Sequence, residues 1–152
     1  MERLYFAYGS NMSSRRLTAR IDGARALGAA RIPHSRLVFD KPGRDGSAKA
    51  NLAPDPGLGR WVWGVVWSVS GLALDTLDRF EPGYDRLERR VLFADGRERA
   101  AATYVWRGDP VLAAPAAWYL EHLLAGAREH ALPPAWRALL GEAHRGARAS
   151  RR

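Results

Sequence analysis

The run of apolar residues at positions 61–69, WVWGVVWSV, is the feature that most constrains how this chain can fold. A strand with one face in water alternates apolar and polar residues, whereas this run is apolar at nearly every position. It is rich in the β-branched and aromatic residues that strands favour, and it is far shorter than the roughly 20 residues of a membrane-spanning helix. The run therefore predicts a central strand that is buried on both faces.

Shorter β-prone segments supply the neighbours that such a strand needs. They lie at residues 4–8, 36–40, 89–93 and 101–106, with Asp95-Gly96 as a hairpin turn between the last two. Residues 41–47 are expected to form a glycine-rich loop and residues 51–59 a second turn region, because turn-forming residues are concentrated there.

Helical signals begin directly after the first of these strands. Ser13 or Asn11 can act as the N-cap of a helix in which Leu17 and Ile21 fall on one face. This helix should end at Asp22-Gly23, where turn chemistry returns.

Three further helical segments follow the apolar run. Ser70 is a favourable N-cap for a helix over residues 71–81, which Pro82-Gly83 should end. The final third has a helical period over residues 115–130, and a second short helix follows Pro133-Pro134. Because strands come first and helices gather late, the sequence predicts a single α+β domain.

Length and composition agree with one packed domain. The chain has 152 residues and a hydrophobic fraction of 47%, which is enough for a core without disulfides, and it has no Cys. Residues 1–144 are expected to form the domain, and residues 145–152 a basic, disordered tail without apolar periodicity. The first residues contain neither a basic leader nor a cleavage site, so we expect a cytoplasmic protein.

The net charge of +8 makes nucleic acid a partner to consider, since clustered basic residues release counterions from phosphate. Lys41 and Lys49 are the two lysines of the chain, and the arginines are scattered along it without a stripe interleaved with aromatic residues. This distribution argues against nucleic-acid binding. The four histidines do not form a pair with metal-ligand spacing, so no metal is expected.

Glu81 is the residue whose position most suggests chemistry. It follows Leu77 by four residues and Leu74 by seven, which places its carboxylate on the helix face that should meet the core. The carbonyl groups at a helix C-terminus disfavour an anion by roughly 0.3–1 kcal/mol, and burial acts in the same direction. Both effects raise the pKa, as general acid/base catalysis near neutral pH requires. The alternative is a glutamate whose side chain bends outward into water.

The turn after the first strand is a second candidate. Gly9 permits a sharp turn, and Ser10 and Asn11 can present N–H groups near the start of the next helix, where anions bind. Residues 43–51 invite the same argument, but they lack the Gly-Lys-Ser/Thr ending of a phosphate-binding loop. Taken singly, each motif is weak and is better explained as a plain strand-to-helix turn.

Four segments taken in order along the chain resemble the γ-glutamylcyclotransferase-like family, also described as AIG2-like. They are FAYGSNM at residues 6–12, the loop at residues 43–52, WGVVW at residues 63–67, and LDRFEPGY at residues 77–84. The resemblance extends from residue 4 to about residue 125. Two departures stand out: Pro82-Gly83 replaces a glycine-led continuation, and Lys49 occupies a position where the family tends to have a small or aliphatic residue.

The resemblance implies a small mixed β-barrel flanked by helices and an enzyme without a cofactor. It also implies release of 5-oxoproline from a small γ-glutamyl substrate by attack of the substrate's own α-amine, with Glu81 as catalytic acid/base. The substrate would be held by Tyr8, Gly9, Ser10, Asn11, Met12, Tyr84 and Tyr119. A binding protein that has kept the fold without turnover is the first alternative, and a basic nucleic-acid-binding domain is the second.

Overall fold

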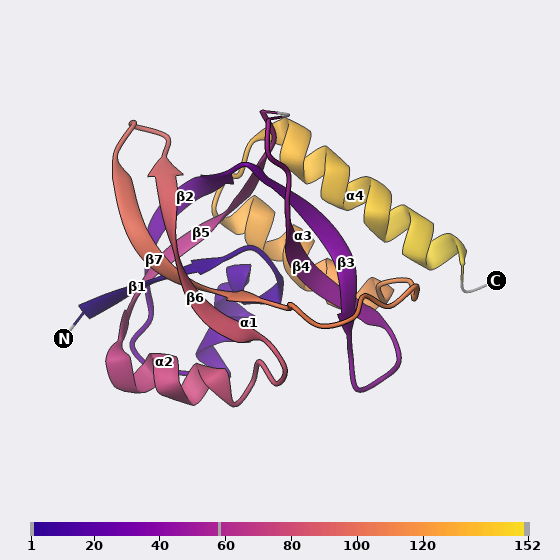
Figure 1. The fold of residues 1–152 in the computed structure, drawn as a ribbon, viewed down its shortest axis with the longest axis horizontal. Coiled ribbons are helices and arrows are strands. Elements are labelled where there is room, and N and C mark those ends of the chain that lie inside the picture. Colours follow the sequence, from indigo (N-terminus) through magenta and orange to yellow (C-terminus); the bar gives the residue numbers. More distant parts are fainter. Residues whose placement is uncertain (1, 58, 151–152) are drawn as a thin grey trace.

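The computed structural model describes residues 2–57 and 59–150. Its centre is a closed five-stranded barrel, with helices and a separate strand pair around it (Figure 1). The barrel order is β1 (Glu2–Ala7), β5 (Trp61–Ser70), β2 (Arg25–Pro33), β6 (Asp85–Phe93) and β7 (Glu98–Val105). β1 and β7 run parallel where the barrel closes, whereas the other neighbouring strands are antiparallel. The expectation of a small mixed barrel is confirmed.

The apolar run forms β5, which pairs with β1 on one side and β2 on the other. Val62, Val65 and Val66 are fully buried, as expected for a central strand. Gly64 interrupts the run because a Cβ there would lie 2.3 Å from the carbonyl oxygen of Ala7. The close approach of β1 to β5 therefore depends on a glycine at this position.

A two-stranded ribbon, β3 (Ser35–Pro42) and β4 (Ala48–Pro54), lies outside the barrel. The prediction of a strand at residues 36–40 is confirmed, but the interpretation of residues 51–59 as a turn region is wrong for residues 51–54. β4 contains Pro, Asn, Lys and three Ala, so its local preference for a strand is weak. Pairing with β3 supplies its backbone hydrogen bonds instead. The sequence also did not predict β2, because the local preference of its residues for a strand is weak as well.

The helix predicted over residues 71–81 is α2 (Gly71–Asp78), which ends three residues early. Its N-cap is Ser70, whose hydroxyl accepts a hydrogen bond from the Ala73 N–H at 3.0 Å. Glu81 lies in the turn that follows, where its own N–H bonds to the Asp78 carbonyl. Ser13 is the cap of the short helix α1 (Ser14–Thr18), preceded by the 3-10 turn η1 (Ser10–Met12).

The last third folds as α3 (Ala117–Glu129) and α4 (Pro134–Ala149), which pack against each other (Figure 1). α4 is longer than the short helix expected there, and the predicted disordered tail is wrong for residues 145–149, which belong to this helix. Ala147 is buried, so the packing of α4 reaches into that segment. Residues 151–152 of the predicted tail lie outside the described residues. Across the described part of the chain, no helix has the length and apolar character needed to cross a membrane.

Candidate functional site

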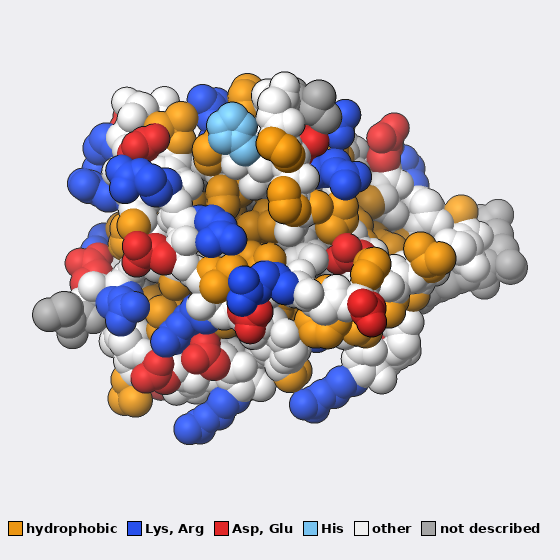
Figure 2. All heavy atoms as spheres, in the orientation of Figure 1, with side chains coloured by type: hydrophobic (Ala, Val, Ile, Leu, Met, Phe, Trp, Pro, Cys, Tyr) orange, Lys and Arg blue, Asp and Glu red, His pale blue; other side chains and the backbone are white. Residues whose placement is uncertain are grey.

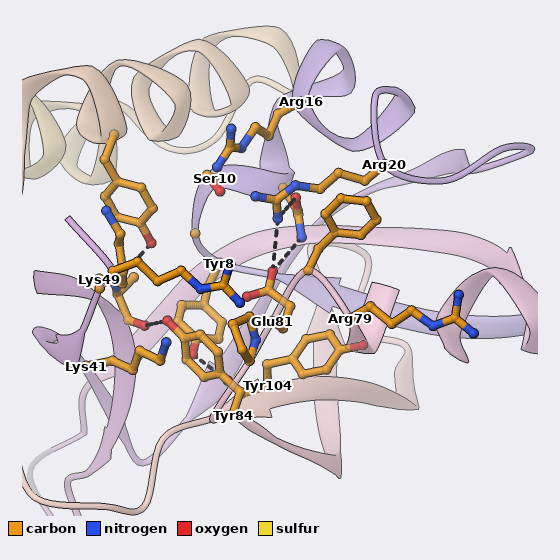
Figure 3. Close-up of a pocket in the computed structure, with 18 of the residues that line it drawn as sticks. Tyr8, Ser10, Arg16, Arg20, Lys41, Lys49, Arg79, Glu81, Tyr84 and Tyr104 are labelled. Atoms are coloured by element: carbon orange, nitrogen blue, oxygen red, sulfur yellow. Dashed lines mark hydrogen bonds and ion pairs between the residues drawn. The ribbon is translucent and has the colours of Figure 1, made fainter. Parts of the chain in front are cut away.

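A cavity of about 380 Å³ opens where η1, the β3–β4 ribbon, the turn after α2 and the start of α3 meet (Figure 3). These elements are far apart in the sequence, and the closed barrel brings them together. The cavity is lined by all but one of the predicted site residues, namely Tyr8, Gly9, Ser10, Asn11, Glu81, Tyr84 and Tyr119. The predicted glutamate and the predicted turn therefore line the same cavity.

Gly9, the first residue of the turn at residues 9–11, lines the cavity and lies close to two other segments of its wall. A Cβ on Gly9 would lie 3.2 Å from the Tyr119 hydroxyl and 3.6 Å from Cβ of Ala50. Ser10 and Asn11 begin the 3-10 turn η1, and the first N–H groups of any helix lack partners within the helix. Both residues are buried, so polar groups of this turn face the cavity with little competition from water.

The Glu81 carboxylate points into this cavity and its side chain is 16% exposed. Oε1 accepts a hydrogen bond from Nδ2 of Asn11 at 2.9 Å and lies 3.3 Å from a guanidinium nitrogen of Arg20. Burial raises the pKa of Glu81 to about 6, while Arg20, Lys41 and the Asn11 hydrogen bond act in the opposite direction. A carboxyl group with such a pKa can both accept and return a proton near neutral pH.

Asn11 and Arg20 hold this carboxylate in place. Asn11 also donates to the Tyr5 hydroxyl at 3.1 Å, and its Oδ1 accepts from Arg20 at 3.2 Å. Arg20 lies over the Phe80 ring, 5.4 Å from its centre. Sequence reasoning missed Arg20 and its neighbour Arg16. The signal that could have found them is their spacing of four residues directly after the turn, which places both on one side of a helical segment.

Tyr84 and Tyr119 both form hydrogen bonds to the backbone of one residue, Ala50 of β4. The Tyr84 hydroxyl donates to the Ala50 carbonyl at 2.6 Å, and the Tyr119 hydroxyl accepts from the Ala50 N–H at 3.0 Å. Burial raises the pKa of both phenols, so both stay protonated at neutral pH. The two predicted tyrosines therefore line the cavity and also fix the ribbon that forms its wall.

Met12 differs from the other predicted site residues, because it is fully buried and is not among the residues that line the cavity. It packs under the turn against α3, where a Cβ on Gly126 would lie 2.4 Å from Cβ of Met12. Its position supports the turn from behind.

Basic side chains line the cavity, and the sequence did not identify them as a group. They are Arg16, Arg20, Lys41, Arg44, Lys49 and Arg79, facing the two acidic residues Asp45 and Glu81. The sequence signal was the restriction of lysine to positions 41 and 49, which β3 and β4 place opposite each other. Their juxtaposition at one cavity required the ribbon, which the sequence had not predicted in full.

Comparisons with known proteins agree with this architecture. Residues 5–121 match the family described as gamma-glutamyl cyclotransferase, AIG2-like. The gamma-glutamylcyclotransferases of Bos taurus and Homo sapiens are each 31% identical to the chain over an alignment that covers 86% of it and 72% of the relative. These relatives are named for an enzyme activity.

Solved structures give the same result in three dimensions. One described as gamma-glutamyl cyclotransferase superposes with a TM-score of 0.85 at 28% identity, covering 93% of this chain and 87% of that one. A human protein described as uncharacterized superposes with a TM-score of 0.84 at 30% identity, covering 92% and 86%. The chain belongs to the γ-glutamylcyclotransferase, AIG2-like family of enzymes.

Proposed function

We propose that this protein is a cofactor-independent γ-glutamylcyclotransferase that releases 5-oxoproline from a small γ-glutamyl substrate, with Glu81 as its general acid/base. The observation that carries the proposal is the buried carboxyl group of Glu81, with a pKa of about 6, beside the turn at residues 9–11 in a cavity of about 380 Å³. The names of the curated relatives point to the same reaction.

The reaction removes two protons from the attacking nitrogen, and Glu81 would carry one of them to the leaving nitrogen. Glu81 would take a proton from the substrate α-ammonium group, and the freed amine would attack the γ-carbonyl carbon of the same glutamyl group. The bond from that carbon to the leaving nitrogen then breaks as Glu81 returns the proton to that nitrogen. The ring nitrogen gives up its second proton to solvent, which leaves 5-oxoproline and a free amine. A ring closure of this kind needs no second reactant, and correct orientation alone can contribute on the order of 7–11 kcal/mol.

The cavity walls would supply the orientation. N–H groups at residues 9–11 would hold either the developing oxyanion or the glutamyl carboxylate, and Asn11 and Arg20 would keep Oε1 of Glu81 in position. Tyr84 and Tyr119, through their hydrogen bonds to Ala50, would hold the β4 wall of the cavity at a fixed position relative to the turn.

The test is release of 5-oxoproline from a panel of γ-glutamyl amino acids and γ-glutamyl amines by the wild type and by Glu81→Gln. We expect Glu81→Gln to lower kcat by roughly 10²–10⁴-fold, because positioned acid/base groups contribute about that much. Glu142→Gln, on the exposed face of α4, is the matched control and should retain activity. Undiminished turnover by Glu81→Gln would reject the mechanism. Absence of 5-oxoproline from every wild-type reaction would favour a non-catalytic binding protein.

A further inference from the structure

The charges around the cavity are strongly unbalanced, with the six basic side chains outnumbering two acidic ones. Two of the cations are already paired: Arg20 with Glu81 at 3.3 Å and Lys49 with Asp45 at 3.4 Å. Arg44 and Arg79 are exposed to water, and Arg79 points away from Glu81 in Figure 3. Two cations remain to face the cavity: Arg16, which is half-buried, and Lys41, which is largely buried.

Lys41 is the more unusual of the two because its side chain is buried, with 8% of the residue exposed. Among the described residues, no carboxylate or carbonyl group pairs with Nζ of Lys41, which lies 4.9 Å from the centre of the Tyr84 ring (Figure 3). Burial lowers the pKa of Lys41, and Glu81 acts in the opposite direction. An ammonium group that is partly withdrawn from water and has no ionic partner is destabilised, and an anion entering the cavity would offset that cost.

Arg16 and Lys41, which form no ion pair with any described residue, lie on different sides of Glu81. Arg16 belongs to α1, directly after the turn, and appears on the same side of Glu81 as Ser10 in Figure 3. Lys41 belongs to β3 and appears on the other side, with Tyr84. A substrate whose glutamyl group occupies the turn would therefore extend its leaving group past Glu81 toward Lys41.

Leaving groups differ in the charge that they would bring to Lys41. An amino acid attached through its nitrogen carries a carboxylate next to that nitrogen, whereas a simple amine carries no charge there and a polyamine adds cations. The basic lining would repel a cationic leaving group and attract an anionic one. Charge complementarity therefore favours an amino acid.

We propose that Lys41 is a specificity-determining residue whose ammonium group binds the carboxylate of an amino-acid leaving group, so that γ-glutamyl amino acids are preferred over γ-glutamyl amines. The inference rests on the proposed function and adds the residue that distinguishes leaving groups by their charge. Lys49 is placed differently, because its ammonium group is held by Asp45 and lies over the rings of Trp118 and Tyr119, at 4.5 and 4.8 Å.

The experiment compares γ-glutamyl-alanine with its C-terminal amide, which has the same shape but lacks the carboxylate charge. Both are assayed for 5-oxoproline at about pH 8, which lies above the pKa of about 6 of Glu81 in the wild type. The wild type should prefer the acid by roughly 10- to 100-fold in kcat/KM, the usual range for a hydrogen bond between charged groups. Lys41→Met should abolish the preference by raising KM for the acid, with little change for the amide.

Two variants serve as controls. Lys49→Met removes the same charge from the same cavity and should keep the preference for the acid, and Lys41→Arg should restore part of it. Isothermal titration of the two compounds with Glu81→Gln measures the same preference without turnover. Circular dichroism and the midpoint of thermal unfolding verify that Lys41→Met is folded.

The outcomes separate this inference from the proposed function. If the wild type turns over both compounds with equal kcat/KM, Lys41 does not recognise the carboxylate of the leaving group. The inference then fails, while the proposed cyclotransferase function stands. The inference also fails if Lys41→Met weakens both compounds equally, because the lysine would then hold the glutamyl carboxylate or support the fold. If the wild type turns over neither compound nor any member of the panel, the proposed function itself fails.

Discussion

At the scale of single residues, the site depends on how strongly one carboxyl group is desolvated. Burial favours the neutral form of Glu81, whereas the positive charges of Arg20 and Lys41 favour the ionised form. Burial is the larger effect, so the pKa lies above that of an ordinary glutamate. The balance leaves Glu81 able to change its protonation state near the pH at which the enzyme would work.

This balance predicts the acidic limb of the pH profile. The general base must be ionised, so kcat/KM for 5-oxoproline release should rise with pH and level off above about 6, the pKa of Glu81. Arg20 lowers that pKa, so Arg20→Gln should move the limb to higher pH. Arg25→Gln removes an arginine from an exposed pair with Glu2 and should leave the limb in place. A limb that does not move in Arg20→Gln, or moves to lower pH, contradicts this account of Glu81.

At the scale of elements, the position of the turn at residues 9–11 depends on how closely α3 approaches it. The approach occurs at Gly126, where a Cβ would lie 2.4 Å from Cβ of Met12 and 2.7 Å from the backbone nitrogen of Ser13. Met12 is the neighbour of Asn11, which binds Glu81. Contact between a helix and a turn that are far apart in the sequence therefore sets the geometry of the site.

Two glycine substitutions in the last two helices should have opposite effects. Gly126→Ala forces α3 away from η1 and should lower the free energy of unfolding by about 1–3 kcal/mol, the usual cost of overpacking. It should also reduce 5-oxoproline release, because the turn shifts. Gly146→Ala in α4 meets no atom within 4 Å and should raise stability by up to about 1 kcal/mol through helix propensity. Urea denaturation followed by circular dichroism measures both effects. Equal effects of the two substitutions would show that the close approach at Gly126 is unimportant.

At the scale of the whole molecule, the cavity joins segments from most of the chain: η1, the β3–β4 ribbon, the turn after α2, and α3. Unfolding any of them removes the site, so ligand binding and global stability must be linked. The charge distribution is a second property at this scale. On the face shown in Figure 2, basic side chains are separated by acidic and apolar ones and do not form a continuous band.

The linkage predicts a thermal shift in a variant that binds without turnover. Glu81→Gln with γ-glutamyl-alanine at about 100 times its Kd should gain roughly 2.7 kcal/mol, which corresponds to a rise in Tm of about 5–10 °C for a chain of this size. Differential scanning fluorimetry measures the shift, and free alanine serves as the control ligand. No shift with any member of the γ-glutamyl panel would mean that the cavity is not the binding site.

The sequence by itself determined the features that rest on local patterns. The continuous apolar run at residues 61–69 predicted the central strand β5, Ser70 predicted the start of α2, and the ordered motifs predicted that Glu81 and the turn at residues 9–11 belong to one site. Propensity, capping and hydrophobic spacing act over a few residues, so they can be read directly from the sequence.

Only the tertiary structure decided the remaining features. β4 is a strand because β3 pairs with it, and residues 145–149 are helical because α4 packs on α3, although neither segment has a strong local signal. The pKa of Glu81 and the isolation of the Lys41 ammonium depend on neighbours that are far away in the sequence. Burial and charge are properties of the space around a residue, and that space is created only when the barrel closes and the distant segments meet.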